Sequence, residues 1–183
     1  MAQAAMPLLF FQVVSAASLA IWAAGAGAIA SAGGGCRGAT RRVFAAIRLV
    51  ARMECFPVNG RSMLPTLHGG SELCGSDVVV GVRPGQSLPF WPRRGEVVIL
   101  VDSVGRMVKR LTFLAEEEGQ TGRAWCWVEG DNARLSEDSR YFGWAPSHRV
   151  EAVAVAVAWP PWRARWLVER GRILEALACA SLV

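Results

Sequence analysis

The first 36 residues of this 183-residue chain contain no charged side chain. Within this stretch, only Gln12 and two serines interrupt the apolar character of segment 8–30. A helix that crosses the hydrocarbon core of a bilayer needs about 20 predominantly apolar residues, and this segment is long enough. Cleaved signal peptides normally begin with basic residues, which are missing here. We therefore predict a retained membrane anchor, formed by a transmembrane helix, within residues 1–36.

Arginines dominate the segment that follows. Five of them precede Glu54, the first acidic residue, although the net charge of the whole chain is only +5. The remainder is close to neutral, which argues against a nucleic-acid-binding surface. Arginines beside an apolar segment suit anionic membrane lipid, so we predict a basic juxtamembrane segment over residues 37–53. An acid-free, Arg-rich N-terminal region is also typical of organellar import. The five arginines are Arg37, Arg41, Arg42, Arg48 and Arg52.

Short β-like segments fill residues 54–162 and alternate with Gly-, Pro- and Asn-rich turns. We predict a mainly β domain over this range. After it, the apolar spacing from Trp166 onward predicts an amphipathic helix within residues 163–183. This helix would lie on a membrane, pack on the domain or hold a partner, and the sequence does not choose among these. The predicted strands are 77–82, 96–101, 106–111, 125–128 and 150–159.

The cysteines and histidines give no sign of a metal site. Five cysteines are widely spaced without a C-x-x-C pair, and neither His68 nor His148 belongs to a ligand cluster. We interpret the cysteines as small buried apolar residues, although an isolated disulfide stays open. We predict no metal and no other cofactor.

The single lysine of the chain is a candidate general base. Of the 20 lysines and arginines, only Lys109 is a lysine. A guanidinium stays protonated in proteins, whereas a desolvated ammonium can lose its proton near neutral pH. The plain alternative is that a lysine-poor chain must place its last lysine somewhere.

A candidate nucleophile lies in segment 59–67, Asn-Gly-Arg-Ser-Met-Leu-Pro-Thr-Leu. Ser62 follows a predicted strand, and Gly60 and Pro65 flank it in a way that suits a rigid turn. A serine hydroxyl is a weak nucleophile until a neighbouring base takes its proton, and Ser–Lys dyads achieve this. No histidine lies near a suitable motif, so lysine is the best available base. An ordinary loop is the alternative.

A third polar segment, residues 130–143, combines turn-forming residues with a possible Asp138–Arg140 ion pair. It could brace a site, with Ser136 or Ser139 forming a hydrogen bond with the base. Taken alone, the segment would be interpreted as a solvated loop.

Together, these segments resemble the signal peptidase I family in order, spacing and flanking sequence. Ser62 begins a match to the nucleophile box, segment 93–98 resembles the R-G-D strand, 107–111 matches the lysine box and 130–143 matches the last box. Within the family, the mitochondrial inner membrane protease, particularly its subunit 2, is the nearest likeness. That likeness rests on two local segments, 67–79 and the Trp-Pro-Pro ending within 158–162.

The resemblance implies a fold and a role for each matched residue. The fold would be a signal peptidase I-like β domain with an N-terminal transmembrane helix and a short C-terminal helix. Ser62 would attack the scissile carbonyl, neutral Lys109 would accept its proton, and the Ser62 N–H would serve the oxyanion. Some bacterial relatives carry a side-chain hydroxyl two positions before the nucleophile. This chain has Gly60 there and therefore lacks that hydroxyl.

Five further residues would support this dyad or shape the substrate cleft. Ser136 occupies the position that hydrogen-bonds the lysine, and Asp138 with Arg140 would form a bracing ion pair. Met63 and Pro65 would shape the cleft. A substrate peptide would lie extended along a strand edge, with small residues near the cut.

The resulting hypothesis is a membrane-bound serine endopeptidase that removes sorting or signal peptides from precursor proteins at the mitochondrial inner membrane. The resemblance implies a catalytic domain facing the intermembrane space and a homologous partner subunit, whereas the arginines after the anchor would favour the matrix side. One alternative is a signal peptidase of a plastid, bacterial or secretory membrane. Another is a non-catalytic scaffold subunit of a protease complex, and a self-cleaving repressor is a weaker alternative.

Overall fold

The computed structural model describes residues 51, 53–70, 75–84, 91–103, 105–116, 124–169, 171–173 and 175. The predicted anchor and nearly all of the basic juxtamembrane segment therefore lie outside the described residues. Among the residues that are described, no helix is long and apolar enough to cross a membrane. The chain divides into two compact units, and the candidate site belongs to the one formed by residues 54–85 and 90–170.

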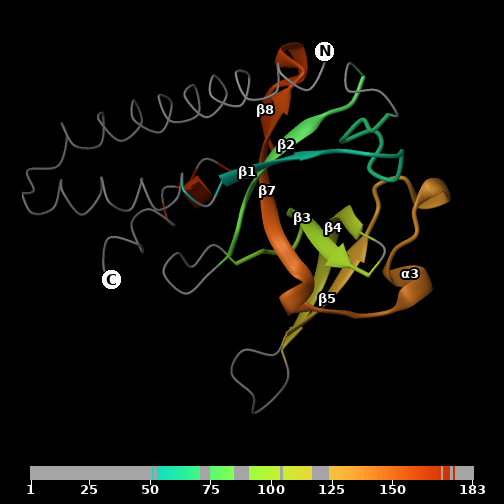
Figure 1. Cartoon of the computed structure of the whole chain (residues 1–183). Helices are drawn as coiled ribbons and strands as arrows, with labels where there is room; N and C mark the ends of the chain where they lie inside the picture. Colours follow the sequence, from blue (N-terminus) through green and yellow to red (C-terminus); the bar gives the residue numbers. More distant parts are fainter. Residues whose placement is uncertain are drawn as a thin grey trace, which may run out of the picture. The chain divides into compact units, whose positions relative to one another are not determined.

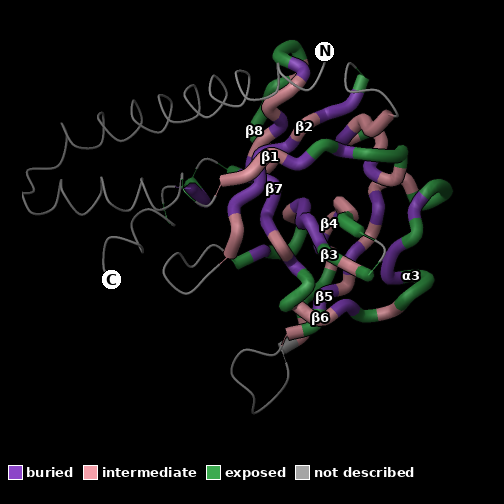
Figure 2. Tube along the Cα trace, viewed as in Figure 1, coloured by how far each residue is buried: buried purple, intermediate pink, exposed green. Residues whose placement is uncertain are grey.

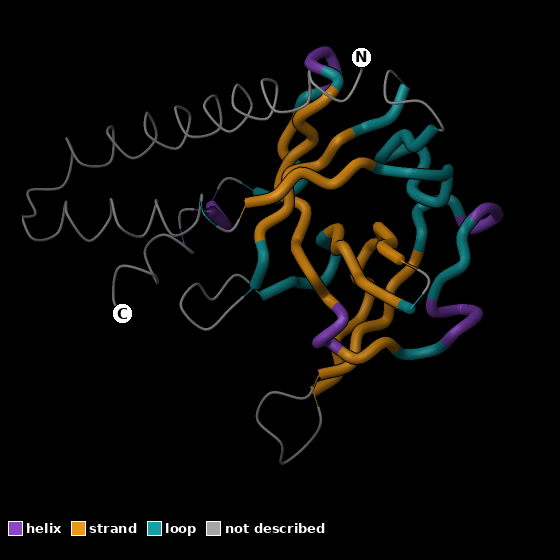
Figure 3. The backbone as a smooth tube through the Cα atoms, viewed as in Figure 1, coloured by secondary structure: helices purple, strands orange, loops and turns teal. Residues whose placement is uncertain are grey.

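The structure confirms a mainly β, antiparallel arrangement (Figure 1, Figure 3). The strands are β1(Met53–Pro57), β2(Val78–Val82), β3(Val97–Asp102), β4(Gly105–Glu116), β5(Ala124–Glu129), β6(Ala145–Pro146), β7(Val150–Trp159) and β8(Arg165–Trp166). Their order in the sheet is β1–β2–β7–β3–β4–β5–β6, with β8 paired to β7. The helices are short: η1(Ala133–Leu135), α3(Ser139–Phe142), η2(Ser147–Arg149) and η3(Pro161–Arg163).

Strand β7 lies inside the sheet although it follows β1 to β6 in the chain. It pairs antiparallel with β2 along one edge and with residues 98–100 of β3 along the other. The segment that carries Ser62 connects β1 to β2, whereas Lys109 belongs to β4. The two candidate catalytic residues therefore come from parts of the sheet that β7 joins.

Strand β3 is buried on both of its faces (Figure 2). Val97 and Ile99 belong to one apolar cluster, whereas Val98 and Leu100 belong to a second cluster. Successive side chains of a strand point to opposite faces, so a strand between two clusters needs an uninterrupted apolar run. This explains why residues 97–100 lack the alternation of a half-exposed strand.

The predicted strands correspond to observed strands, and β7 has the predicted bounds. The start of the predicted C-terminal helix is wrong, because residues 165–166 form β8 and pair with Ala156 and Val157 of β7. Strand β3 covers only the first residues of β7, up to Val153. The remaining edge of β7 has backbone groups that need partners, and β8 supplies them. Farther along the predicted helix, residues 171–173 and 175 are helical, and the other residues from 170 to 183 lie outside the described residues.

Candidate active site

Ser62 lies on a turn that is fixed by its neighbours. Gly60 adopts a φ of 78°, a left-handed conformation that favours glycine. Leu67 N donates a hydrogen bond to the carbonyl of Met63 at 2.8 Å, and both side chains belong to the apolar core cluster. Ser62 itself is half-buried. The turn thus presents a serine at the surface of a rigid support.

The two residues predicted to shape the substrate cleft have different environments. Met63 is only 1% exposed and packs within the core, so it anchors the turn and does not line an open cleft. Met63 and Leu67, at the two ends of the turn's 2.8 Å hydrogen bond, are both buried in the same cluster and hold the turn against the core. Pro65 is exposed, which is compatible with its predicted role.

Lys109 is positioned on β4 opposite Val98 of β3. Its side chain is only 5% exposed, and Nζ donates a hydrogen bond to Oγ of Ser136 at 3.1 Å. Burial lowers the pKa of this amine, an effect that the carboxylates of Asp138 and Glu137 oppose. The net direction is downward, which favours the neutral amine that a general base requires.

The segments that carry Ser62 and Lys109 meet at Gly130. A methyl group placed on Gly130 would lie 2.6 Å from the carbonyl oxygen of Ser62 and 2.5 Å from Cβ of Ser136. The same carbonyl of Ser62 accepts a hydrogen bond from Asn132 N at 2.9 Å. Ser62 and the serine that holds Lys109 therefore pack against one glycine. Among the described residues, no hydrogen bond joins the Ser62 hydroxyl directly to Lys109.

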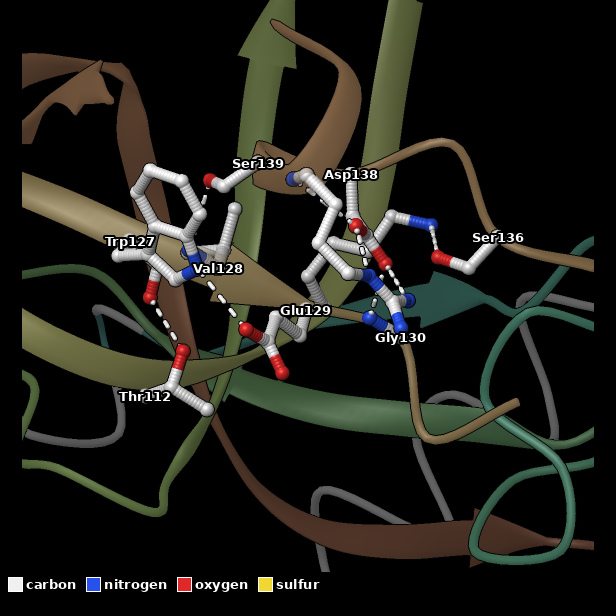
Figure 4. A network of polar contacts seen from close by, with 10 residues as sticks. Thr112, Trp127, Val128, Glu129, Gly130, Ser136, Asp138 and Ser139 are labelled. Atoms are coloured by element: carbon white, nitrogen blue, oxygen red, sulfur yellow. Dashed lines mark hydrogen bonds and ion pairs between the residues drawn. The ribbon is translucent and has the colours of Figure 1, made fainter. Parts of the chain in front are cut away.

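Asp138 organises the segment that contains Ser136 (Figure 4). It is fully buried, it caps the N-terminus of α3, and its carboxylate accepts hydrogen bonds from Gly130 N at 2.8 Å and from Nε of Arg140 at 2.8 Å. Nη2 of Arg140 completes the predicted ion pair. Of the two serines considered as partners of the base, Ser136 contacts it, whereas Oγ of Ser139 accepts a hydrogen bond from the backbone of β5.

The ionised form of Asp138 is favoured in the folded chain. Burial alone would raise the pKa of its carboxyl, but hydrogen bonds from Arg140, Gly130 and Ser136 outweigh this and lower the pKa well below the usual range. The carboxylate therefore stabilises the fold above its unfolded pKa of about 3.9. That stabilisation is lost as the pH falls toward the lower folded pKa.

We expect Asp138→Asn to lower the thermal unfolding midpoint by several degrees at neutral pH. The difference from wild type should shrink below about pH 4, where the unfolded carboxyl is already protonated. Circular dichroism melts between pH 7 and pH 3 measure both effects. Asp102→Asn is the control, because Asp102 is only half-buried and its ion pair with Arg149 spans 3.4 Å. A difference for Asp138→Asn that does not change with pH would contradict the assignment.

The chain is similar in sequence to a known mitochondrial protease subunit. The chain is 29% identical to the mitochondrial ATP-independent inner membrane protease subunit 1a of Arabidopsis thaliana, and the match covers 68% of this chain and 89% of that protein. No family model matches the chain. The relative is a member of the signal peptidase I family. The predicted family resemblance is confirmed. Because the relative is a subunit 1a, the match does not favour subunit 2 over subunit 1.

Arg110, which is not among the predicted site residues, connects the four segments that resemble the signal peptidase I family. Arg110 donates two hydrogen bonds of 2.7 Å to the carboxylate of Asp131 and one of 2.6 Å to the carbonyl of Gly95. A longer contact of 3.4 Å reaches the hydroxyl of Thr66. Arg110 thus connects the lysine box to the other three. In the sequence, Arg110 is marked only by its place within the lysine box, directly after Lys109.

The described residues contain no group of three or more histidine, cysteine or acidic side chains that could hold a metal ion. Cys55 and Cys126 are free thiols. Cys126 is fully buried in the second core cluster, and burial raises its pKa to about 11. A thiol in this state is protonated and unreactive near neutral pH.

Proposed function

We propose that this chain is a membrane-bound serine endopeptidase with Ser62 as nucleophile and Lys109 as general base. The observation that carries the proposal is the convergence of two elements on Gly130: the turn of Ser62, and Ser136, which holds the buried amine of Lys109. An exposed lysine would be protonated at neutral pH, but a desolvated lysine beside a serine can activate its hydroxyl. Catalytic hydrogen bonds are often longer before substrate binds.

The reaction uses groups that the chain itself supplies. Oγ of Ser62 attacks the carbonyl carbon of the scissile peptide bond, and Nζ of neutral Lys109 accepts the hydroxyl proton. The Ser62 N–H stabilises the oxyanion of the tetrahedral intermediate. The ammonium of Lys109 then returns its proton to the leaving amine, and water hydrolyses the acyl-enzyme by the same route. Ser136 keeps the amine oriented, and the activity rises with pH as Lys109 loses its proton.

The proposed substrates are precursor proteins tethered to the mitochondrial inner membrane, from which the enzyme removes sorting peptides. The name of the Arabidopsis relative supports both the location at the mitochondrial inner membrane and the protease activity. The Arg-rich, acid-free segment before Glu54 agrees with import into an organelle. The relative is named as a subunit, which supports a homologous partner chain. A shared membrane raises the effective concentration of enzyme and substrate.

The proposal is tested with Ser62→Ala in the full-length chain, reconstituted in phospholipid vesicles with a membrane-tethered precursor and no ATP. We expect wild type to cut the precursor and Ser62→Ala to be slower by at least ~10³-fold. Ser103→Ala is the matched control, because Ser103 is an exposed serine in the turn after β3.

Two outcomes would overturn the proposal in different ways. Cleavage by Ser62→Ala at the rate of wild type would show that another residue is the nucleophile. If wild type does not cut the precursor, either alone or with a homologous subunit added, the chain is not a protease under these conditions. The alternative of a non-catalytic scaffold subunit would then be favoured. Protease protection of the full chain in mitochondria and in mitoplasts tests the location and the side of the membrane.

A further inference from the structure

Two arginines follow β7, and neither belongs to the boxes matched above. Arg165 contacts the segment around Ser62, and Arg163 contacts residues just before β2. Nη2 of Arg163 lies 2.6 Å from Oδ1 of Asp77 and donates a hydrogen bond of 3.3 Å to the carbonyl of Gly75. Nη2 of Arg165 donates a hydrogen bond to the carbonyl of Thr66. Nη1 of Arg165 also bonds the carbonyl of Arg163 at 3.1 Å. The pairing of β8 with β7 fixes the backbone of this segment.

Asp77, the partner of Arg163, holds both ends of the segment that carries Ser62. Its carbonyl accepts a hydrogen bond from Val58 N at 2.8 Å, before Ser62. Its N–H donates to the carbonyl of His68 at 2.7 Å, and its Oδ2 accepts from His68 N at 2.8 Å, after Ser62. Residues 58–68 therefore form a loop that is closed by one aspartate.

The closed loop has little room to shift. A methyl group on Gly69 would lie 2.7 Å from the carbonyl carbon of Asn59 and 2.7 Å from Gly60 N, and closer still to the carbonyl oxygen of Gly60. The backbone after Ser62 thus packs directly against the backbone before it. A displacement at either end of the loop would be transmitted to the serine.

The carboxylate of Asp77 needs a charged partner to stay in its position. Its side chain is fully buried, and an ionised carboxylate without a partner at such a site is strongly destabilising. His68 approaches Asp77 only to 3.9 Å through Nδ1, so Arg163, at 2.6 Å, is the closer cation among the residues that the structure describes. Two of the bonds that close the loop use the backbone of Asp77, and the third uses its carboxylate. Arg163 holds that carboxylate, and with it the position of Asp77.

We propose that Arg163 and Arg165 are positioning residues that hold the closed loop, residues 58–68, in the position that brings Ser62 toward Lys109. Arg163 acts through Asp77 on the two ends of the loop, and Arg165 acts through the carbonyl of Thr66 on its middle. Neither arginine needs to touch the substrate. The inference rests on the proposed function for its kinetic consequence, but the contacts that it explains are independent of any reaction.

The test is Arg163→Gln in the full-length chain, measured by precursor cleavage and by amide hydrogen exchange. We expect kcat to fall by ~10-fold to 100-fold, because a displacement of about 1 Å at a reacting group can cost ~10² in rate. The KM should change by less than ~2-fold. Arg163→Lys, which keeps the positive charge near Asp77, should recover part of the loss. Arg149→Gln is the control, because Arg149 pairs with Asp102 outside the loop.

Hydrogen exchange separates a positioning role from a general loss of stability. The amides of Val58 and His68 should exchange faster in Arg163→Gln, while those of Ile99 and Leu100 in the core strand β3 keep wild-type rates. Unchanged exchange over 58–68 together with wild-type kcat would overturn the proposal. Faster exchange in all strands, with a loss of kcat that follows the unfolded fraction, would also overturn it.

The same experiment distinguishes this inference from the proposed function. If wild type does not cut, or if Ser62→Ala cuts equally well, the proposed function fails. Exchange at Val58 and His68 still decides whether Arg163 holds the loop. If Ser62→Ala is inert and Arg163→Gln behaves like wild type in both measurements, only the positioning role fails.

Discussion

Replacing Lys109 with arginine is expected to abolish cleavage while the positive charge is retained. A guanidinium stays protonated at any pH at which the protein is folded, so it cannot accept the proton of Ser62. Loss of a general base costs ~10² to 10⁴ in rate, and we expect the loss here at the upper end of that range. The measurement is single-turnover cleavage of a membrane-tethered precursor, alongside thermal unfolding of each variant.

Two further variants make this result interpretable. Lys109 is only 5% exposed, so the larger arginine could disturb the packing, whereas Lys109→Met has a similar length and removes the base without added bulk. Arg94→Lys is the control for the substitution type, because Arg94 is exposed and lies over the ring of Phe113. Cleavage by both Lys109 variants within ~10-fold of wild type would mean that another group activates the serine.

The second large effect is expected for Gly130→Ala. The added methyl group would lie 2.6 Å from the carbonyl of Ser62 and 2.5 Å from Cβ of Ser136, separations that real side chains do not adopt. Either the serine turn or the segment that holds Lys109 must therefore move. We expect kcat to fall by ~10² or more and the free energy of unfolding to fall by about 1–3 kcal/mol, as for other overpacked sites.

The control for this variant is Gly171→Ala. A methyl group on Gly171 would meet no atom within 4 Å, so the same substitution there adds no clash. Urea unfolding gives the stability of both variants, and kcat is measured at a temperature at which each is folded. A folded Gly130→Ala variant with kcat within ~3-fold of wild type would show that the convergence at Gly130 is not required.

The strands could be predicted from the sequence because their signals are local. Runs of β-branched residues bounded by turn residues correspond to β2 and β3, and a Val–Ala alternation corresponds to β7. Such patterns indicate a strand without information from elsewhere in the chain. The start of the C-terminal segment was predicted less well, because a helical spacing of apolar residues was overridden by the free edge of β7. That edge exists only in the folded sheet.

The sequence predicts the hydrogen bond between Ser136 and Lys109 and the Asp138–Arg140 ion pair, and the structure contains both. Other contacts that hold the site together are not predicted. Asn132 bonds the carbonyl of Ser62 and Arg163 pairs with Asp77, and each pair is separated by a long stretch of chain without a pattern that links the two positions. The resemblance implies a cleft position for Met63, whereas the structure places its side chain in the core. The residue next to a reactive serine can point to the surface or into the core. Its direction depends on the conformation of the turn, which the sequence does not give.

The position of β7 between β2 and β3 determines when the candidate site can form during synthesis. During synthesis or passage through a membrane, the N-terminal parts that carry Ser62 and Lys109 emerge first. They cannot be united in the sheet until residues 150–159 have arrived, and the arginines that fasten the serine loop come later still. Under the proposed function, an unfinished chain would therefore be unable to hydrolyse peptide bonds, and completion of the polypeptide would itself be the step that forms the active enzyme.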